Sequence, residues 1–313
     1  MGLGGHEYRR PLPTTLGRWG DINNEQFALK QSERNALIRT AVEEGINYFD
    51  ATQTEEARSL GIALGELGLR ERVNVAAMII FPFRQLAQNS RSKWHETVIE
   101  AVEERFRLLQ TDHVEVLNIH MPEDNYSRER LEVTLKAIGE MKDRGTVGWV
   151  GASSHEPNFL AEIMRKYDCF DSVMVRYNYH LQEAREALFP LCKALNVGVV
   201  IMKPLSWPFY GIPFTRFSPQ KEQDTILTPA QVCLRWILTS PEVSTVVPSI
   251  NSPDELQENV EAIPKEGQIQ EEVLAHHLAL AKSPLGRERL TKMLQDPAID
   301  IRHFAKRALA GEE

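Results

Sequence analysis

Two polar residues stand at the ends of apolar, strand-like runs, and both have side chains that can move a proton. Asp50 closes the run GINYFD, and His120 closes the run VLNIH. A partly desolvated carboxylate can orient a neighbouring group or shift its pKa, and an imidazole can act as a general acid or polarise a carbonyl. We expect both residues to lie in one catalytic site, because the ends of parallel strands meet. The alternatives are a helix-capping aspartate and a satisfied core histidine.

Later runs add residues suited to binding. Ser153 and Ser154 end a further run, where their hydroxyls could hold a carboxamide or a phosphate, and His155 could join His120 in contacting substrate. Turn and capping chemistry is the alternative. Lys203, in the run VIMKPL, suits a phosphate or a cofactor carboxamide, since late strand ends of parallel barrels often hold phosphate. The alternative for Lys203 is a salt bridge at the rim.

The remaining candidates are weaker. The turn PSINS before a helix has free amides that could bind an anion, or it could serve as a plain cap. Near the N-terminus, Tyr8 could donate a proton and His6 could contact substrate. Trp207, in a loop, could form a binding wall, whereas Trp149 is expected in the core. The histidines and Asp50 have no local metal-ligand spacing, so we predict no metal site.

The composition limits the class of protein. The chain has 313 residues, of which 42% are hydrophobic, and a formal net charge of -8. This length fits one large barrel, and the acidic balance disfavours nucleic acid as a partner. Apolar runs are too short for a membrane span or a signal peptide. The three cysteines show no CxxC spacing and are expected to be reduced core thiols of a cytoplasmic protein. We expect a small-molecule substrate, and the oligomeric state is not predicted.

Short apolar runs alternate with amphipathic stretches along most of the chain. This alternation predicts a (β/α)8 TIM barrel over residues 1–263, with strands too apolar for a solvent-facing sheet, and a C-terminal helical extension over residues 264–313. The expected strands, besides a short first one at 2–6, are 46–51, 73–79, 113–120, 146–153, 171–178, 197–205 and 244–250. The expected helices are 33–44, 55–67, 91–109, 127–144, 158–166, 181–195, 229–239 and 253–262.

The chain resembles the aldo-keto reductases from about Gly2 to Ile263. The resemblance is carried by collinear segments, namely GINYFDA, RFRLLQTDHVEVLNIH, GTVGWVGASSH, VRYNYH, GVVIMKPL, TPAQVCLRWILTSPEVSTVVPSI and ELQENV. It implies an oxidoreductase that reduces or oxidises a small carbonyl or alcohol substrate, with NADP lying across the strand ends.

The same resemblance assigns roles to individual residues. Members of the family use a tetrad of aspartate, tyrosine, lysine and histidine, and Asp50 and His120 would fill the first and last roles. Met78 stands at the lysine position. The loop of the tyrosine is shorter, and Glu55 stands nearest the missing residue. The implied cofactor-binding residues are Ser153, Ser154, Lys203, Pro204, Leu205, Ser249, Ile250, Asn251, Glu258 and Asn259, and Met174 replaces the glutamine that usually holds the carboxamide.

These departures leave three functions open. The first is an NAD(P)-linked oxidoreductase with a non-standard acid/base set of Asp50 and His120, helped by Glu55 or Tyr8. The second is a non-redox enzyme, such as a lyase, isomerase or hydrolase, on the same barrel. The third is a catalytically inactive binding protein. Loss of a general acid typically removes roughly 10²–10⁴-fold in rate, which is why ordinary aldehyde reduction is not the default.

Overall fold

The computed structural model describes residues 30–79, 86–121, 126–178, 181–205 and 228–263. The expected first strand at 2–6 and the C-terminal helices lie outside the described residues. The candidates His6, Tyr8 and Trp207 lie outside them as well. The structure of the site is therefore built from the other candidates.

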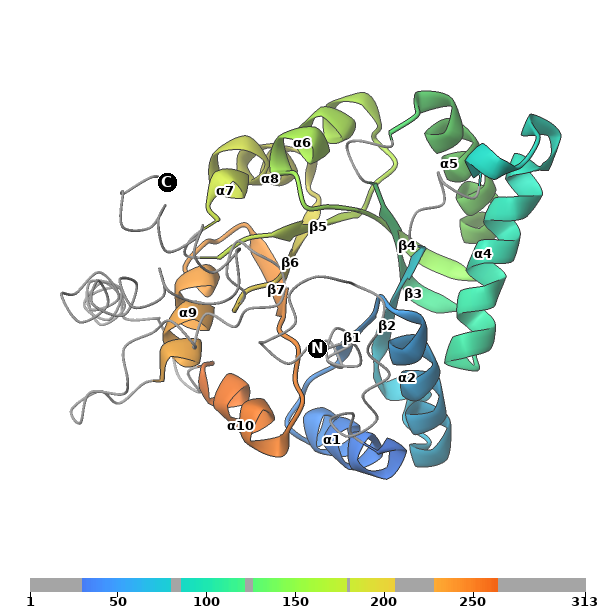
Figure 1. Ribbon diagram of the computed structural model, residues 1–313. Helices are drawn as coiled ribbons and strands as arrows, with labels where there is room; N and C mark the ends of the chain where they lie inside the picture. Colours follow the sequence, from blue (N-terminus) through green and yellow to red (C-terminus); the bar gives the residue numbers. More distant parts are fainter. Residues whose placement is uncertain (1–29, 80–85, 122–125, 179–180, 206–227, 264–313) are drawn as a thin grey trace, which may run out of the picture.

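Seven parallel strands form a nearly closed barrel, with each strand paired to its neighbour in sequence order (Figure 1). The sequence predicted all seven. They are β1 (Tyr48–Ala51), β2 (Asn74–Ile79), β3 (Val114–His120), β4 (Val147–Ser154), β5 (Ser172–Arg176), β6 (Gly198–Met202) and β7 (Val243–Val247).

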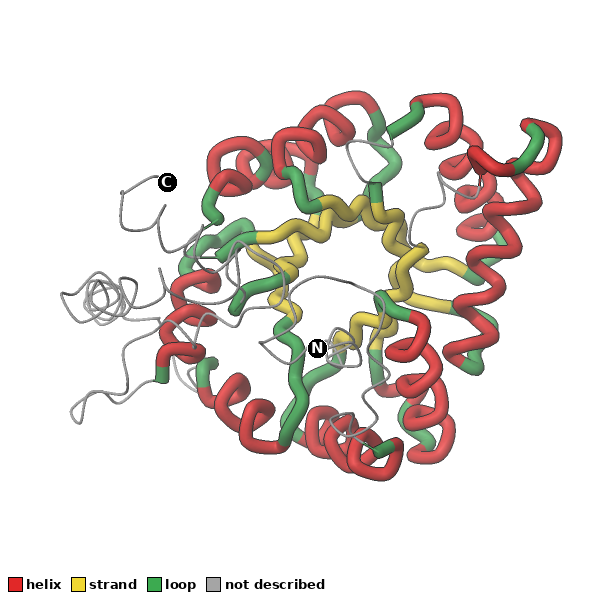
Figure 2. Tube along the Cα trace, in the orientation of Figure 1, coloured by secondary structure: helices red, strands yellow, loops and turns green. Residues whose placement is uncertain are grey.

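Helices surround the ring of strands, as Figure 2 shows. They are α1 (Gln31–Glu43), α2 (Thr54–Leu67), α4 (Trp94–Leu109), α5 (Arg128–Asp143), α6 (Pro157–Lys166), α7 (Glu183–Ala187), α8 (Phe189–Leu195), α9 (Pro229–Leu238) and α10 (Pro253–Glu261), with short 3-10 turns η2 (Arg70–Arg72) and η3 (Arg91–Lys93). None of these described helices is long and apolar enough to cross a membrane.

The strands are buried on both faces, as expected of a parallel barrel. Outward residues such as Phe49, Leu117 and Val173 belong to the large core under the helices. Inward residues form a second, small apolar cluster of Met78, Met174, Val200 and Val247, with Tyr48 and Met202 packed against it. Because side chains alternate along a strand, the same alternation sends the polar strand-end residues toward the barrel mouth.

The prediction of a single helix over 181–195 is wrong, because the structure has two helices there, α7 and α8. The break falls at Leu188, whose φ and ψ are -114° and -43°. Pro190 lies in the first turn of α8, where the amide that it lacks would have no helical partner. A proline inside one continuous helix would instead have removed a backbone hydrogen bond.

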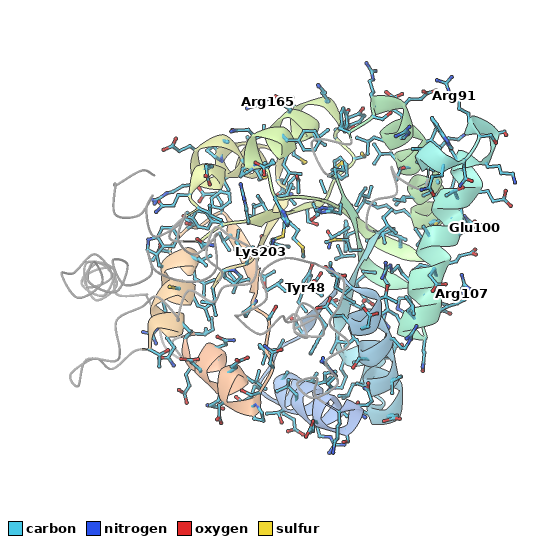
Figure 3. The ribbon with its side chains drawn as sticks, in the orientation of Figure 1. Tyr48, Arg91, Glu100, Arg107, Arg165 and Lys203 are labelled. Carbon is cyan, nitrogen blue, oxygen red and sulfur yellow. The ribbon has the colours of Figure 1, made fainter. Side chains whose placement is uncertain are left out.

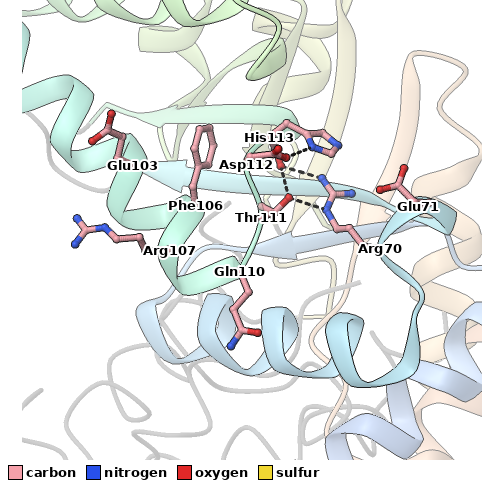
Figure 4. Close-up of a pocket in the computed structure, with 9 residues that line it drawn as sticks. All are labelled: Arg70, Glu71, Glu103, Phe106, Arg107, Gln110, Thr111, Asp112 and His113. Carbon is pink, nitrogen blue, oxygen red and sulfur yellow. Dashed lines mark hydrogen bonds and ion pairs between the residues drawn. The ribbon is translucent and has the colours of Figure 1, made fainter.

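Arg70 connects the amino-terminal ends of β2 and β3 through hydrogen bonds. Its guanidinium lies 3.1 Å from Glu115 Oε1 and donates to the carbonyl of His113 at 2.9 Å and to Thr111 Oγ1 at 3.2 Å. Glu115 in turn accepts from the backbone amide of Val75. Arg70 also lines a surface hollow of about 750 Å³ (Figure 4). Since its donors are engaged within the protein, we interpret the hollow as part of the scaffold.

Two expectations about the core need correction. Trp149 is 58% exposed rather than buried, and the Lys142 ammonium lies 5.3 Å from its ring centroid. This cation–π contact stabilises an indole that the core does not cover. Cys192 and Cys233 are buried as expected, but Cys169 is exposed.

Candidate active site

Asp50 is the penultimate residue of β1 and lies in a nearly dry environment. Its side chain is only 7% exposed, and Oδ2 accepts a hydrogen bond from Thr52 Oγ1 at 2.8 Å. The other oxygen, Oδ1, is buried and has no hydrogen-bond partner within the described residues. Burial raises the pKa of Asp50 to about 6, and the bond from Thr52 offsets part of this shift. The carboxyl group can therefore both hold and release a proton near neutral pH.

Met78 lies beside Asp50 where the family resemblance predicted a lysine. It is 3% exposed, and its sulfur lies 3.8 Å from Thr52 Oγ1. Thioether sulfur carries no charge, so it cannot stabilise the ionised form of Asp50 as an ammonium would. The high pKa of Asp50 follows from burial, and the uncharged Met78 does nothing to lower it.

Tyr48 and Asn118 lie one layer deeper in the barrel. Burial, then the charge of Asp50, raise the pKa of Tyr48, while a hydrogen bond with Asn118 lowers it. Tyr48 is thus a poor proton donor. A Cβ at Gly151 would collide with Asn118 Oδ1, which explains a glycine inside β4.

His120 ends β3 and faces the next strand. Its Nδ1 lies 3.5 Å from Ser153 Oγ, consistent with the register that pairs these two residues. Burial, then the positive charge of Lys203, lower the pKa of His120 to about 4. The imidazole is therefore neutral at physiological pH, and it can donate one hydrogen bond and accept another.

His155 links His120 to Lys203. The two imidazole rings lie edge to face with centroids 5.6 Å apart, and His155 Nε2 lies 3.1 Å from Lys203 Nζ. Burial, then the charge of Arg176, lower the pKa of Lys203 to about 7. Figure 3 shows Lys203 and Tyr48 both near the centre of the ring of strands. The strand ends thus bring three nitrogen-bearing side chains into one connected group.

Other predicted residues serve local structure. Glu55 lies in the first turn of α2, where its charge acts on Arg105, and none of the described hydrogen bonds joins it to Asp50 or His120. Ser154 Oγ accepts from the amide of Glu156 at 3.2 Å, which is the turn chemistry that the sequence left open. Pro204 is buried and Leu205 partly buried directly after β6.

The predicted anion-binding turn before α10 contains a carboxylate of its own. The amide of Asn251 donates to Glu255 Oε2 at 2.7 Å, and Ser252 Oγ accepts from the amide of Glu255 at 3.1 Å. Ser249 is exposed, whereas Ile250 is 1% exposed and belongs to the large core. The capping alternative therefore describes this turn.

The two remaining cofactor candidates lie farther along α10. Asn259 is 9% exposed, and the backbone carbonyl of Glu258 accepts from Gln231 of α9 at 3.1 Å. Both positions contribute to the packing of α10 against α9.

Two residues of the site had no part in the prediction. Arg176 ends β5 and lies close enough to lower the pKa of Lys203, with Glu156 at 3.4 Å as its carboxylate partner. Thr52 is the hydrogen-bond donor of Asp50. Two features of the sequence could have indicated these residues. Arg176 ends the strand-like run VMVR, and Thr52 follows Asp50 by two residues. No group of metal-binding side chains occurs in the part of the chain that the structure describes.

Comparison with known proteins agrees with this arrangement. The family model described as Aldo/keto reductase family matches residues 15–212 and 216–278. A Schizosaccharomyces pombe protein named as a voltage-gated potassium channel subunit beta is 24% identical over 80% of this chain and 83% of its own. The uncharacterized oxidoreductase YqkF of Bacillus subtilis is 22% identical over 77% of this chain and 85% of its own.

A solved structure shares the fold. The holo form of the aldo-keto reductase AKR11C1 from Bacillus halodurans superposes with a TM-score of 0.62, at 22% identity, over 81% of this chain and 89% of that one. The strand-end site and the barrel define a protein of the parallel α/β barrel class. The chain belongs to the aldo/keto reductase family.

Proposed function

We propose that this protein is an NAD(P)-linked oxidoreductase that interconverts a small carbonyl compound and its alcohol, with Asp50 and His120 as its acid/base groups. The observation that carries the proposal is family membership combined with a buried carboxyl group on β1 and a neutral imidazole at the end of β3, two strands that both pair with β2. Relatives named as oxidoreductases support the reaction class.

The residues at the mouth fit a dinucleotide in part. Ser153, Ser154 and Lys203, with Arg176 beside them, offer hydroxyls and positive charge to the nicotinamide and pyrophosphate ends. The fit is poorer at the adenosine end. There the carboxylate of Glu255 already accepts a hydrogen bond from the backbone amide of Asn251, in the turn that would meet a phosphate. The cofactor, when bound, would supply or accept the hydride.

The chain's own residues would handle the proton. At pH values near 6, part of the Asp50 population is protonated and can serve as the acid, since its pKa lies at about 6. Neutral His120 would donate a hydrogen bond to the carbonyl oxygen and hold the substrate in place. This division of roles resembles that of other sites in which two groups have pKa values displaced in opposite directions.

Titration of NADPH and NADH by intrinsic fluorescence tests the proposal. We expect saturable quenching of the tryptophans with at least one cofactor, because the family places the dinucleotide over the strand ends. A matched variant, Ser153→Ala, removes only the hydroxyl that faces His120, so it should weaken binding. Absence of binding at high micromolar concentrations of both cofactors would end the proposal.

A second candidate function rests on the apolar side chains Met78 and Met174. Both are nearly fully buried at the positions where the family pattern has lysine and glutamine, which favours a non-redox enzyme on the same scaffold. Turnover of carbonyl, ester and hydroxy-acid substrates without cofactor would support this function. Activity that depends strictly on added NAD(P)H would exclude it.

A further inference from the structure

Lys203 lies at a place where the backbone favours glycine. It directly follows β6, and its φ is +56°, one of three such values at non-glycine residues in the described part of the chain. This left-handed conformation is strained for a residue that carries a side chain. Asn178 Nδ2 donates to the Lys203 carbonyl oxygen at 3.0 Å and helps to hold it. Strain that the surrounding structure maintains is concentrated at functional sites.

The amine of Lys203 is held in a setting that favours its neutral form. It is partly buried, Arg176 acts on it with a like charge, and His155 Nε2 lies 3.1 Å away. With a pKa of about 7, about half of these amines are unprotonated at pH 7. For an ordinary lysine the corresponding share is about one in a few thousand.

The neighbouring charged groups allow protons to be exchanged. His155 lies between the Lys203 amine and His120. The ring centroids of His155 and His120 are 5.6 Å apart. Arg176 keeps a permanent positive charge and is itself paired with Glu156 at 3.4 Å. A hydrogen-bonded imidazole can accept a proton from the amine and return it to a departing group.

We propose that the Lys203 amine is a nucleophile that captures an aldehyde or ketone at the barrel mouth as an imine, with His155 moving the protons. A desolvated lysine beside another cationic group is the setting in which amines perform this chemistry. Only the unprotonated half of the Lys203 amines takes part in this step, and the protonated half can still bind an anion.

The step balances without an oxidant or a reductant. The nitrogen lone pair forms a C–N bond to the carbonyl carbon, and the oxygen takes one of the two amine protons by way of His155. The nitrogen then gives up its second proton, again by way of His155, to the hydroxyl group so formed. This group leaves as water while the C=N bond forms. An amine and a carbonyl compound thus become an imine and one molecule of water.

Reductive trapping tests the proposal without any nicotinamide cofactor. The full chain is incubated at pH 7 with acetaldehyde or pyruvate and sodium cyanoborohydride, and alkylated lysines are located by peptide mass spectrometry over time. We expect the Lys203 peptide to be modified at least about tenfold faster than that of Lys193, whose side chain is 70% exposed. This comparison is made within the wild-type chain and needs no variant to fold.

Variants sharpen the result. Lys203→Arg keeps the charge and should abolish the fast modification, whereas Lys193→Arg should leave it intact. His155→Gln should slow trapping and change its pH profile, which loss of packing alone would not do. The proposal is overturned if Lys203 is modified no faster than Lys193 for either probe. Because no cofactor is present, a failure of NADPH to bind would count against the oxidoreductase proposal and leave this result unchanged.

Discussion

The two sides of the barrel mouth have opposite chemistry. The Asp50 side, made of Asp50, Thr52 and Met78, has one buried carboxyl group next to a thioether. The Lys203 side, made of His155, Arg176 and Lys203, has an imidazole in contact with an amine and a permanently charged guanidinium close by. Burial raises the pKa of the acid and lowers that of the lysine, so both groups titrate near neutrality for the same reason. Burial is thus the first cause of the shifted pKa on each of the two sides.

The largest expected effect concerns Asp50 and stability. Its folded-state pKa of about 6 lies above the ordinary aspartate value of 3.8, so the folded state binds more protons and loses stability as the pH rises from about 4 to 6. The loss is on the order of 3 kcal/mol. Asp50→Asn, which stays neutral, should remove this dependence. Urea unfolding at pH 4, 5, 6 and 7 measures it, and parallel curves for both proteins would contradict the assignment.

Restoring a cation on the Asp50 side should reverse the shift. In Met78→Lys, an ammonium close to the carboxylate should lower the pKa of Asp50 by about 1–3 units. Carbon-detected NMR titration of the carboxyl group provides the measurement, with Met78→Leu as the apolar control. An unchanged pKa would mean that residue 78 does not reach Asp50 and that the two sides are not chemically distinct.

A smaller effect is expected when the charge of Lys203 is removed. Burial is the main cause of the low pKa of His120 and the charge of Lys203 the second, so Lys203→Met should raise the pKa of His120 by less than about one unit. Proton NMR of the imidazole follows this change, and Lys193→Met is the control for a distant lysine. A fall in the pKa would show that the two residues do not interact as positive charges.

The smallest effect concerns the turn before α10. Glu255→Gln removes a negative charge but keeps an acceptor for the Asn251 amide, so it should tighten NADPH binding by a few-fold at most, because the site is exposed. Glu261, at the far end of the same helix, provides the control variant Glu261→Gln. Equal affinity of both variants for NADPH would show that the phosphate does not approach this turn.

The sequence was sufficient for the barrel but only partly for the site. Apolar runs bounded by amphipathic stretches located all seven described strands, because strands buried on both faces leave a strong pattern. The sequence predicted Asp50, His120, His155 and Lys203 to lie at the barrel mouth, because each stands at or close to the end of such a run. The roles of Arg176 and Thr52 depend on distances across strands, which spacing along one chain does not encode. The break at Leu188 and the exposure of Trp149 likewise depend on tertiary packing.

The distribution of the cysteines gives the folded chain a built-in reporter. Cys192 and Cys233 are enclosed and burial raises the pKa of both thiols, so Cys169 is the sulfhydryl exposed to solvent among the three in the sequence. A fluorophore attached there would sit just before β5, the strand that ends at Arg176. Labelling stoichiometry would rise from one toward three as the barrel opens, which makes thiol counting a direct measure of its integrity.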